Sequence, residues 1–231
     1  MRGLNLRDAI LVDVDLSGKD LTGTDLTNSV LTIEELSPVK DLSCCRYNFS
    51  NSNLTDIDLS GKDLSKIFFS DADLSNKDLT GTNLSEVNLS NMDLSNTVLR
   101  YADLTNVNLT NVDLSGKDLT GTVLTGIILP NTDLTGVTLV DTKNIKDVNL
   151  SGKDLTNANL TGVDLSGKDL TNTDLTGANL TEVNLTDVDL SGKDLRNTDL
   201  TGADLTNADT GNTLRENAIL DCFNNRICSS E

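Results

Sequence analysis

Four cysteines and a large set of aspartates are the residues of this sequence that could bind a metal or support catalysis. The cysteines, Cys44, Cys45, Cys222 and Cys228, form two pairs near opposite ends of the 231-residue chain. A structural zinc site needs about four cysteine or histidine ligands around one ion. The chain has no histidine, and its aspartates recur in near-identical surroundings, so no single acid is marked as a catalytic group. The sequence therefore predicts no enzyme, no metal site and no cofactor.

The aspartates belong to a five-residue repeat that runs from Leu6 to Leu205 with brief interruptions. The central apolar residue, position i, is nearly always Leu; position i−1 is mostly Asp or Asn, and position i+1 is mostly Ser or Thr. Position i+2 is commonly Gly or Asn, as at Gly23 and Asn91. These two residue types accept the positive φ that the third position of a type II turn requires. We therefore expect a short strand and a corner in each unit, with i and i−2 facing inward and i−1 and i+1 facing outward.

About forty such tandem units, over about nine-tenths of the chain, resemble the pentapeptide repeat family. The resemblance implies an all-β fold, a right-handed quadrilateral β-helix with four units in each coil. The units over residues 1–212 would then form a solenoid of about ten coils, roughly 48 Å long at about 4.8 Å per coil, around a core of stacked leucines. In such a solenoid the two cysteine pairs lie roughly 40 Å apart, so they cannot share one metal ion.

Two interruptions depart from the five-residue spacing. The first is an irregular insertion at residues 37–48, and the second is a single extra residue near residues 140–143. Each is either a tolerated bulge at a corner or a recognition loop on an otherwise uniform surface. The candidate interaction residues of the first insertion are Pro38, Cys44, Cys45, Arg46 and Tyr47.

The repeat stops after Ala208, and residues 213–231 are predicted to form a C-terminal capping helix and tail. Helical spacing over about residues 213–225 places Leu214, Ala218 and Cys222 on one face, with Ile219 and Phe223 beside it. An open β-helix end exposes its core and a row of unpaired backbone groups, so a cap is expected there. The helix is either a cap alone or, as the family resemblance implies, a cap that also forms a dimer seam. Its candidate interaction residues are Leu214, Ala218, Ile219 and Phe223.

Lysine occupies the nominally inward position i−2 in several units, mostly within the sequence Ser-Gly-Lys-Asp-Leu. An unpaired buried ammonium would cost several kcal/mol. We therefore expect the corner to change shape, so that the lysine stem lies along the wall and the ammonium reaches water. The lysines are Lys19, Lys62, Lys77, Lys117, Lys153, Lys168 and Lys193.

The net charge of −18 and the isoelectric point near 4.2 oppose direct binding to a phosphate backbone. The sequence has no apolar stretch typical of a secretion signal or a membrane-spanning helix. Four cysteines are too few and too oddly placed for a disulfide scaffold, which favours a reducing cytoplasm. We therefore predict a cytoplasmic protein that binds neither nucleic acid nor membrane.

Two functions are compatible with these patterns. The first is a non-enzymatic structural or protein-interaction rod, which binds protein partners or a second copy of itself through its ends, as a component of a larger assembly. The alternative comes from the family resemblance alone: an acidic mimic of duplex DNA that binds a type II topoisomerase (DNA gyrase) and modulates fluoroquinolone sensitivity. The acidic charge fits this alternative, whereas the lysines that interrupt the acidic faces oppose it.

Overall fold

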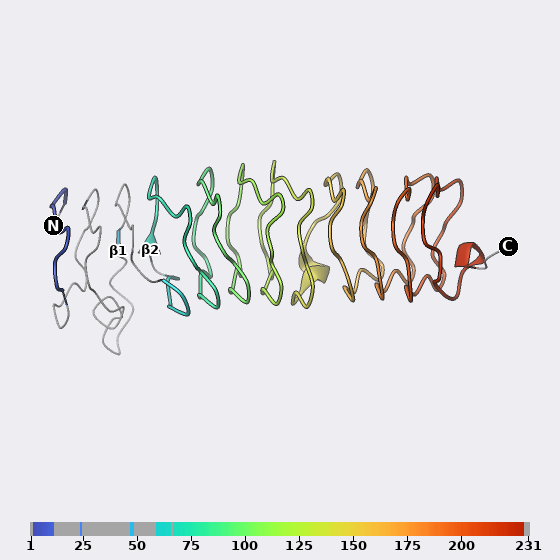
Figure 1. The fold of residues 1–231 in the computed structure, drawn as a ribbon, viewed down its shortest axis with the longest axis horizontal. Helices are drawn as coiled ribbons and strands as arrows, with labels where there is room; N and C mark the ends of the chain where they lie inside the picture. The colour runs from blue at the N-terminus through green and yellow to red at the C-terminus, as the bar shows by residue number, and fades with distance from the viewer. Residues whose placement is uncertain (1, 12–23, 25–46, 49–58, 66, 229–231) are drawn as a thin grey trace. The chain divides into compact units, whose positions relative to one another are not determined.

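The structure, a computed structural model, describes residues 2–11, 24, 47–48, 59–65 and 67–228. These residues belong to two compact units. Unit 1 contains the chain up to residue 112 together with residues 128–131, and unit 2 contains residues 113–127 and 132–228. Successive coils of the chain stack within each unit (Figure 1). Most of the irregular insertion predicted at residues 37–48 lies outside the described residues.

Parallel bridges between residues 20 positions apart define the coil. In unit 1, Asn83 pairs with Asp63 and with Asp103; in unit 2, Asn184 pairs with Asp164 and with Asp204. A separation of 20 residues contains four five-residue units, so each coil has four sides. This is the quadrilateral coil that the repeat predicts.

Regular strands are very short in this fold. Strand β1 (Tyr47–Asn48) pairs in parallel with β2 (Ile67–Phe68), with Tyr47 opposite Ile67. The other ladder contacts of the described residues are single bridges, mostly at position i−1, because a corner follows each short side. Two 3-10 helices, η1 (Ile145–Asp147) and η2 (Arg226–Cys228), are the helical elements of the described residues. The predicted all-β fold is therefore a stack of bridged turns rather than a sheet of long strands.

Each corner has the conformation that the repeat predicts. Position i+2 has positive φ at Asn91 (60°) and Gly121 (70°), and also at Glu86 (64°). The corner is closed by a hydrogen bond from the backbone N–H at i+3 to the carbonyl at i, as from Thr122 to Leu119 at 3.1 Å. A positive φ at i+2 with this bond is the pattern of a type II turn. Glu86 shows that the stack imposes this conformation even on a residue that does not favour it.

The inward assignment of positions i and i−2 is confirmed. Leu160 and Leu195, at position i, are fully buried, and so are Ala158 and Val183 at position i−2. Thr198 is buried at i−2 because its hydroxyl donates a hydrogen bond of 2.6 Å to the Leu195 carbonyl. A buried hydroxyl with a partner avoids the desolvation cost of an unpaired polar group.

The aspartates and asparagines at position i−1 hold the corners together. The Oδ1 atom of Asp189 accepts a hydrogen bond from the Ser191 backbone N–H at 2.8 Å, and Asn184 accepts one from Thr186 at 3.0 Å. The hydroxyl at i+1 often binds the same oxygen. These bonds confirm the predicted structural role of the Asp column. They also hold the pKa of Asp154, Asp189 and Asp204 below the ordinary value of an aspartate, since they favour the ionised form.

We expect the protein to lose stability in acid because of these bonds. A carboxyl whose pKa is lowered by folding stabilises the folded state above its unfolded pKa, and that stabilisation is lost as the pH falls through the lower folded value. The window lies below about pH 4. Replacing Asp154, Asp189 and Asp204 by Asn keeps the Oδ1 acceptor and removes the titration. The fall in melting temperature from about pH 6 to about pH 3 should therefore be smaller in this variant; an equal fall would contradict the assignment.

The inward lysines do not all reach water as predicted. Lys77 is only 9% exposed. The Lys168 ammonium donates hydrogen bonds to the backbone carbonyls of Lys146, at 2.6 Å, and Val148, and the Lys193 ammonium donates one of 3.3 Å to the Thr173 carbonyl. Burial lowers the pKa of Lys168 and Lys193. The prediction that every lysine ammonium reaches water did not include this arrangement, in which the ammonium donates a hydrogen bond to a carbonyl of the preceding coil.

We expect Lys168→Val to stabilise the protein by about 1 kcal/mol. Two features are usual at position i−2. The side chain is buried, as at Val188, which lies one coil after Lys168. The backbone carbonyl accepts a ladder hydrogen bond from the next coil, as the Val183 carbonyl does from the Asp204 N–H at 2.9 Å. Valine at position 168 would restore both features and remove the desolvation of the ammonium. Thermal unfolding measures the change, with Lys143→Val, on an exposed residue, as the control. Destabilisation by Lys168→Val alone would show that the ammonium contacts outweigh burial.

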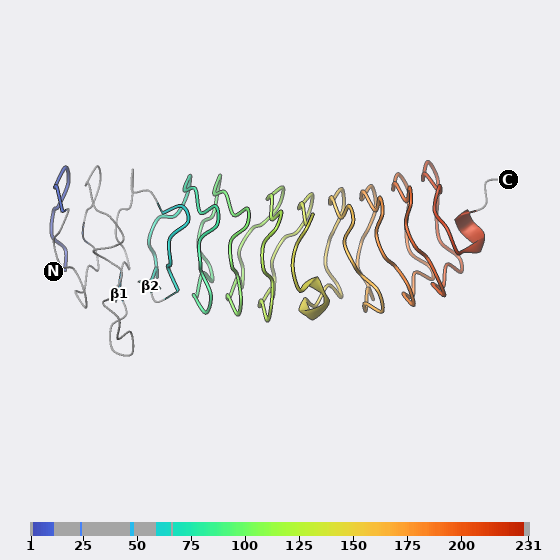
Figure 2. The same ribbon diagram turned by 90° about the horizontal axis from the view of Figure 1, so that it is seen from below.

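The extra residue predicted near residues 140–143 is absorbed at η1, just after that range. Val123 pairs with Lys143, 20 positions away, whereas Thr138 pairs with Asn159, 21 positions away. Asn144 adopts positive φ (61°) before η1, and Ile145 is buried, so the inward side of the coil is kept. Lys146 projects from η1 and forms an ion pair with Asp164 at 2.8 Å. The extra residue is thus accommodated at one corner (Figures 1 and 2).

The C-terminal capping helix predicted at residues 213–225 is wrong. Leu214 pairs with Asp194, Ile219 pairs with Asp199 and both pairs are parallel bridges, so the solenoid continues through this stretch. Ladder hydrogen bonds to the coil below outweigh the local helical spacing. The only helical turn here is η2, which follows the last bridged residue, Phe223.

Candidate functional site at the C-terminal coil

The last coil places apolar residues where the coils below carry acids or amides. Leu214, Ile219 and Phe223 pair with Asp194, Asp199 and Asp204, so they occupy outward positions i−1. Their exposed fractions are 55%, 52% and 46%. Because successive units lie on successive sides of the coil, the three side chains face outward on three different sides. They form a ring of exposed apolar side chains around the last coil rather than one contiguous patch.

The inward residues of the last coil line an open end. Arg215 and Leu220 are at position i, and Ala218 is at position i−2, with no further coil of the described residues over them. A hollow of about 810 Å³ lies at this end, lined by these residues together with Asp221, Arg226, Ile227 and others. Ala218 therefore lies inside the hollow, and not on one face with Leu214 and Cys222 as the helix prediction had it.

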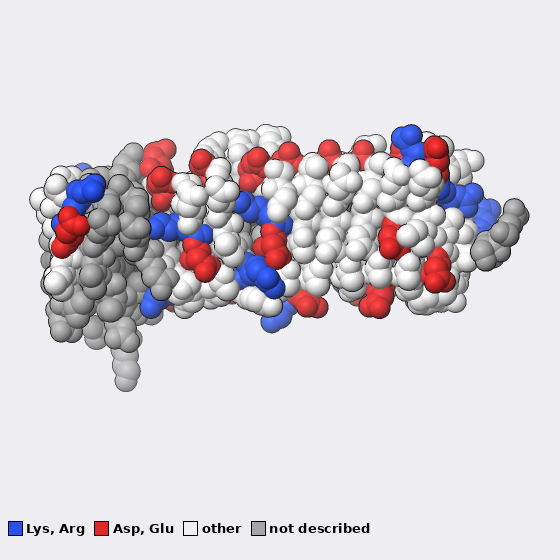
Figure 3. All heavy atoms as spheres, viewed as in Figure 1, with Lys and Arg blue, Asp and Glu red and all other residues white. Residues whose placement is uncertain are grey.

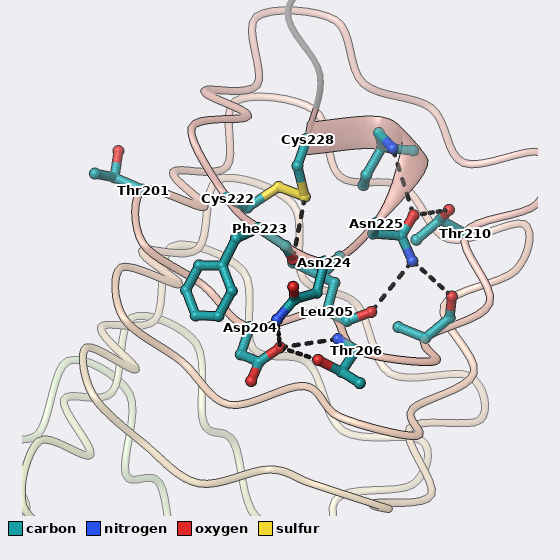
Figure 4. Close-up of a disulfide and its surroundings, with 12 residues drawn as sticks. Thr201, Asp204, Leu205, Thr206, Thr210, Cys222, Phe223, Asn224, Asn225 and Cys228 are labelled. Atoms are coloured by element: carbon teal, nitrogen blue, oxygen red, sulfur yellow. Dashed lines mark hydrogen bonds between the residues drawn. A yellow bond between two sulfur atoms is a disulfide. The ribbon is translucent and has the colours of Figure 1, made fainter.

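The η2 turn covers part of this end. Ile227 is 4% exposed and closes the core. Asn225 anchors the turn: its amide donates hydrogen bonds to the carbonyls of Leu205 (3.2 Å) and Ala208 (2.8 Å), and its Oδ1 accepts one from the Thr210 hydroxyl (3.0 Å). Figure 4 shows Asn225 at the centre of these bonds, and Figures 1 and 2 both show η2 beside the last coil. The cap is thus one polar anchor and one buried isoleucine.

A disulfide between Cys222 and Cys228 joins η2 to the last coil. The phenyl ring of Phe223 points away from Asn225 in Figure 4, and Phe223 remains 46% exposed. Disulfides persist mainly in oxidising compartments. The prediction of a reducing cytoplasm does not account for this bond. In the described residues, no helix is long and apolar enough to cross a membrane.

Among the described residues, the lining of the hollow contains more basic than acidic side chains. Its lining contains two arginines, Arg215 and Arg226, and one acid, Asp221, whereas the whole chain carries −18. Lys and Arg atoms gather at the C-terminal end of unit 2 in Figure 3. In the described part of the chain, the Arg215 side chain makes no ion pair or hydrogen bond. This guanidinium is therefore available to an anionic group of a ligand.

The structure describes one of the site residues predicted in the first insertion. Pro38, Cys44, Cys45 and Arg46 lie outside the described residues, and Tyr47 belongs to β1. Among the described residues there is also no cluster of acids and cysteines that could hold a metal ion. The sequence reasoning missed Arg215, Asn225 and the disulfide partner of Cys222, because it treated this stretch as a helix.

The repeat geometry agrees with a family comparison. A model of pentapeptide repeats matches in eight copies over residues 1–32, 52–91, 78–116, 118–152, 144–177, 154–192 and 178–209. The chain belongs to the pentapeptide repeat family. The pentapeptide repeat fold is a right-handed quadrilateral β-helix, which supplies the handedness of these four-sided coils.

Several solved pentapeptide repeat structures are similar to this chain. HetL, which is involved in heterocyst differentiation regulation in the cyanobacterium Nostoc, is 24% identical over 96% of this chain and 89% of its own, with a TM-score of 0.43. Rfr23 from the cyanobacterium Cyanothece is 27% identical over 62% of this chain and 86% of its own, with a TM-score of 0.20. QnrB1, a plasmid-mediated fluoroquinolone resistance protein, is 18% identical over 94% and 92%, with a TM-score of 0.28. These TM-scores are low, so the family assignment rests on the repeat match. No curated protein matches the sequence.

Proposed function

We propose that this pentapeptide repeat protein is a non-enzymatic scaffold that binds a protein partner, or another copy of itself, through its C-terminal coil. The observation that supports this function is the exchange of Asp194, Asp199 and Asp204 for exposed apolar residues one coil later. Outward acids keep a solenoid surface soluble, whereas exposed apolar side chains favour burial against a partner. The net charge of −18 supports a protein partner rather than nucleic acid.

A pair of matched variants tests this proposal. The first replaces Leu214, Ile219 and Phe223 by Asp, which gives the last coil the residue type of the coil below it. The control places three aspartates at other i−1 positions that carry apolar residues, Val98, Val123 and Ile128. Both variants change the net charge equally and avoid the core, so their melting temperatures should stay close to that of the wild type.

Sedimentation velocity and affinity capture from the source cells then measure binding. We expect the terminal variant to lose self-association or the captured partner, and the control variant to keep it. Equal retention by both variants would contradict binding through the C-terminal coil. Equal loss from both would place the interaction on the sides of the coils.

A second candidate is DNA mimicry, and one observation favours it. Asp154 pairs with Asp174 and Asp189 pairs with Asp209, so carboxylates align on successive coils of unit 2. Lowered pKa values keep Asp154 and Asp189 ionised. A mimic would inhibit gyrase supercoiling in competition with DNA, and its binding would weaken steeply with salt. Binding through the C-terminal coil instead predicts no inhibition at micromolar protein.

A further inference from the structure

The wall of unit 2 is open between two of its coils. Residues 170–175 and residues 189–194 lie on successive coils and should be joined by ladder hydrogen bonds. Within the described residues, three backbone N–H groups of the earlier coil make no hydrogen bond. They are those of Leu170, Asn172 and Leu175. The facing carbonyls, of Asp189, Ser191 and Asp194, accept none from any residue that the structure describes.

The opening is local, because ladder bonds are present around it. Farther along the same two coils, the Gly177 N–H donates to the Arg196 carbonyl at 2.9 Å. One coil later, the Leu190 N–H donates to the Asp209 carbonyl at 2.8 Å, which is the equivalent of the bond that Leu170 lacks. The opening is therefore a slit between two coils and not a break in the solenoid.

The side chain of Lys193 explains why the coils separate here. Its ammonium donates a hydrogen bond of 3.3 Å to the Thr173 carbonyl. One coil earlier, the equivalent carbonyl, of Lys153, accepts the Asp174 N–H at 3.0 Å. Lys193 thus takes the acceptor that the Asp194 N–H would use, and that N–H has no acceptor in the described part of the chain. A side chain stands between the coils in place of a backbone bond.

The lining of the slit favours a neutral, polar ligand. The slit has a volume of about 500 Å³, within the usual range of small-molecule sites, but no aliphatic or aromatic residue lines it. An apolar ligand therefore does not fit. The carboxylates of Asp174, Asp189 and Asp194 oppose an anion, whereas the Lys193 ammonium and the unpaired N–H groups oppose a cation.

The unpaired backbone groups indicate which polar group fits. One edge of the slit presents N–H donors, and the other edge presents carbonyl acceptors. A hydroxyl can accept a hydrogen bond from the first edge and donate one to the second at the same time. Unpaired backbone groups inside a protein are costly, and ordered water commonly satisfies them. A ligand hydroxyl can replace such a water and reproduce its hydrogen bonds, which preserves affinity.

We infer that the slit binds a neutral polyhydroxylated ligand of the saccharide class. Its hydroxyl groups bridge the N–H groups of Leu170 and Asn172 to the carbonyls of the facing coil, and further hydroxyls donate to the carboxylates of the lining. Gly192 leaves room for a sugar ring, because a Cβ atom added there would meet no atom within 4 Å. The slit shares no lining residue with the C-terminal hollow, so this inference does not rest on the proposed function.

Nuclear magnetic resonance of the nitrogen-15-labelled full chain, titrated with maltotriose, cellotriose and xylotriose, tests the inference. At least one trisaccharide should shift the amide signals of Leu170, Asn172 and Asp194 at millimolar concentration. The amides of Leu155 and Leu180, which make ladder bonds of 2.9 and 2.7 Å, should not shift. Tetraethylene glycol dimethyl ether is the control ligand, because its oxygens accept hydrogen bonds but cannot donate them. It should leave all five amides unchanged.

The variant Gly192→Asn should weaken saccharide binding at least about tenfold, because its side chain fills the slit. Asparagine suits this corner: Gly192 has a φ of 67°, and Asn172 has a φ of 57° at the equivalent corner one coil earlier. The matched control is Gly162→Asn. Gly162 has a φ of 68° and the same room for a Cβ atom, but it does not line the slit. This control should bind the saccharide as the wild type does.

A second variant, Lys193→Val, closes the slit instead of filling it. Valine is a usual residue at i−2, and without the ammonium the Asp194 N–H can donate to the Thr173 carbonyl. This variant should also lose the saccharide-dependent shifts, and it decides the question if Gly192→Asn lowers the melting temperature.

Three results would each overturn the inference. The first is the absence of shifts at Leu170, Asn172 and Asp194 with all three trisaccharides. The second is equal saccharide binding by the wild type and a folded slit variant. The third is a larger shift at these amides with spermidine, or with the ether, than with any trisaccharide, because the slit would then bind a cation or an acceptor rather than hydroxyl groups.

Discussion

Leu119→Asp is expected to lower the free energy of unfolding by at least about 5 kcal/mol. Leu119 is 2% exposed at the inward position i, so the substitution removes a core leucine and buries a carboxylate without a partner. The stack offers no route to water at this position, because ladder bonds hold its backbone: the Leu119 N–H donates to the Thr138 carbonyl at 2.9 Å.

The control for Leu119→Asp is Val123→Asp. Val123 lies at the outward position i−1, where aspartate is the usual residue, so its replacement should cost no more than about 1 kcal/mol. Chemical denaturation of both variants gives the two values. Similar losses would show that the inward and outward assignment is wrong. Thr120→Asp, at the outward position i+1, would be a poorer control, since the hydroxyl and the N–H of Thr120 both donate hydrogen bonds to Asp118.

The double variant Cys222→Ser and Cys228→Ser is expected to release η2 from the last coil. The disulfide closes a short loop, and closing a loop of this size stabilises the folded state by about 2 kcal/mol. Hydrogen exchange should accelerate at Ile227 and at the Cys228 amide, which donates to the Asn225 carbonyl at 3.1 Å. Amides of the middle coils, such as Leu160, which donates to Asn179 at 2.9 Å, should keep their protection.

A dithiol reductant provides the control for this variant. It should reproduce the faster exchange in the wild type, since it converts the disulfide to two thiols, and should add nothing to the double-serine variant. Unchanged exchange at Ile227 in both cases would show that Asn225 and Ile227 hold η2 without the covalent bond.

The repeat was predictable because local chemistry explains the residue type at each of its positions. Leucine at every fifth position fixes the inward side, and Gly or Asn at i+2 supplies the corner, so the four-sided coil required only the family resemblance. The lysines were harder, because the fate of the Lys168 ammonium depends on the Val148 carbonyl of the preceding coil. The position of a lysine in the repeat predicts that its side chain starts inward, but it does not predict which backbone carbonyl the ammonium will bind.

The C-terminal coil was mispredicted because apolar spacing was given more weight than corner chemistry. Thr210 and Arg215 occupy position i, so the leucine rhythm disappears, and Leu214 and Ala218 then suggest a helix. The corner residues nevertheless continue in step: Asn207, Asn212 and Asn217 all have positive φ, at 58°, 57° and 59°. An asparagine at every fifth position was the signal that the solenoid continues. The pairing of Cys222 with Cys228 and the anchor at Asn225 had no such signal, because they depend on the path of the chain over the end of the core.

The way η1 absorbs one residue bears on how such a gene can change length. A single inserted codon shifts the pairing of Thr138 to Asn159 and leaves the sides of the later coils in line. Duplication of one five-residue unit would instead turn every later side by a quarter turn and bring different outward columns into one row. Only gains or losses of four units keep each column intact. A surface built from an aligned column, such as the carboxylates of Asp154 and Asp174, is therefore kept only when the chain gains or loses a multiple of 20 residues. The leucine core, by contrast, tolerates the gain or loss of any whole number of units.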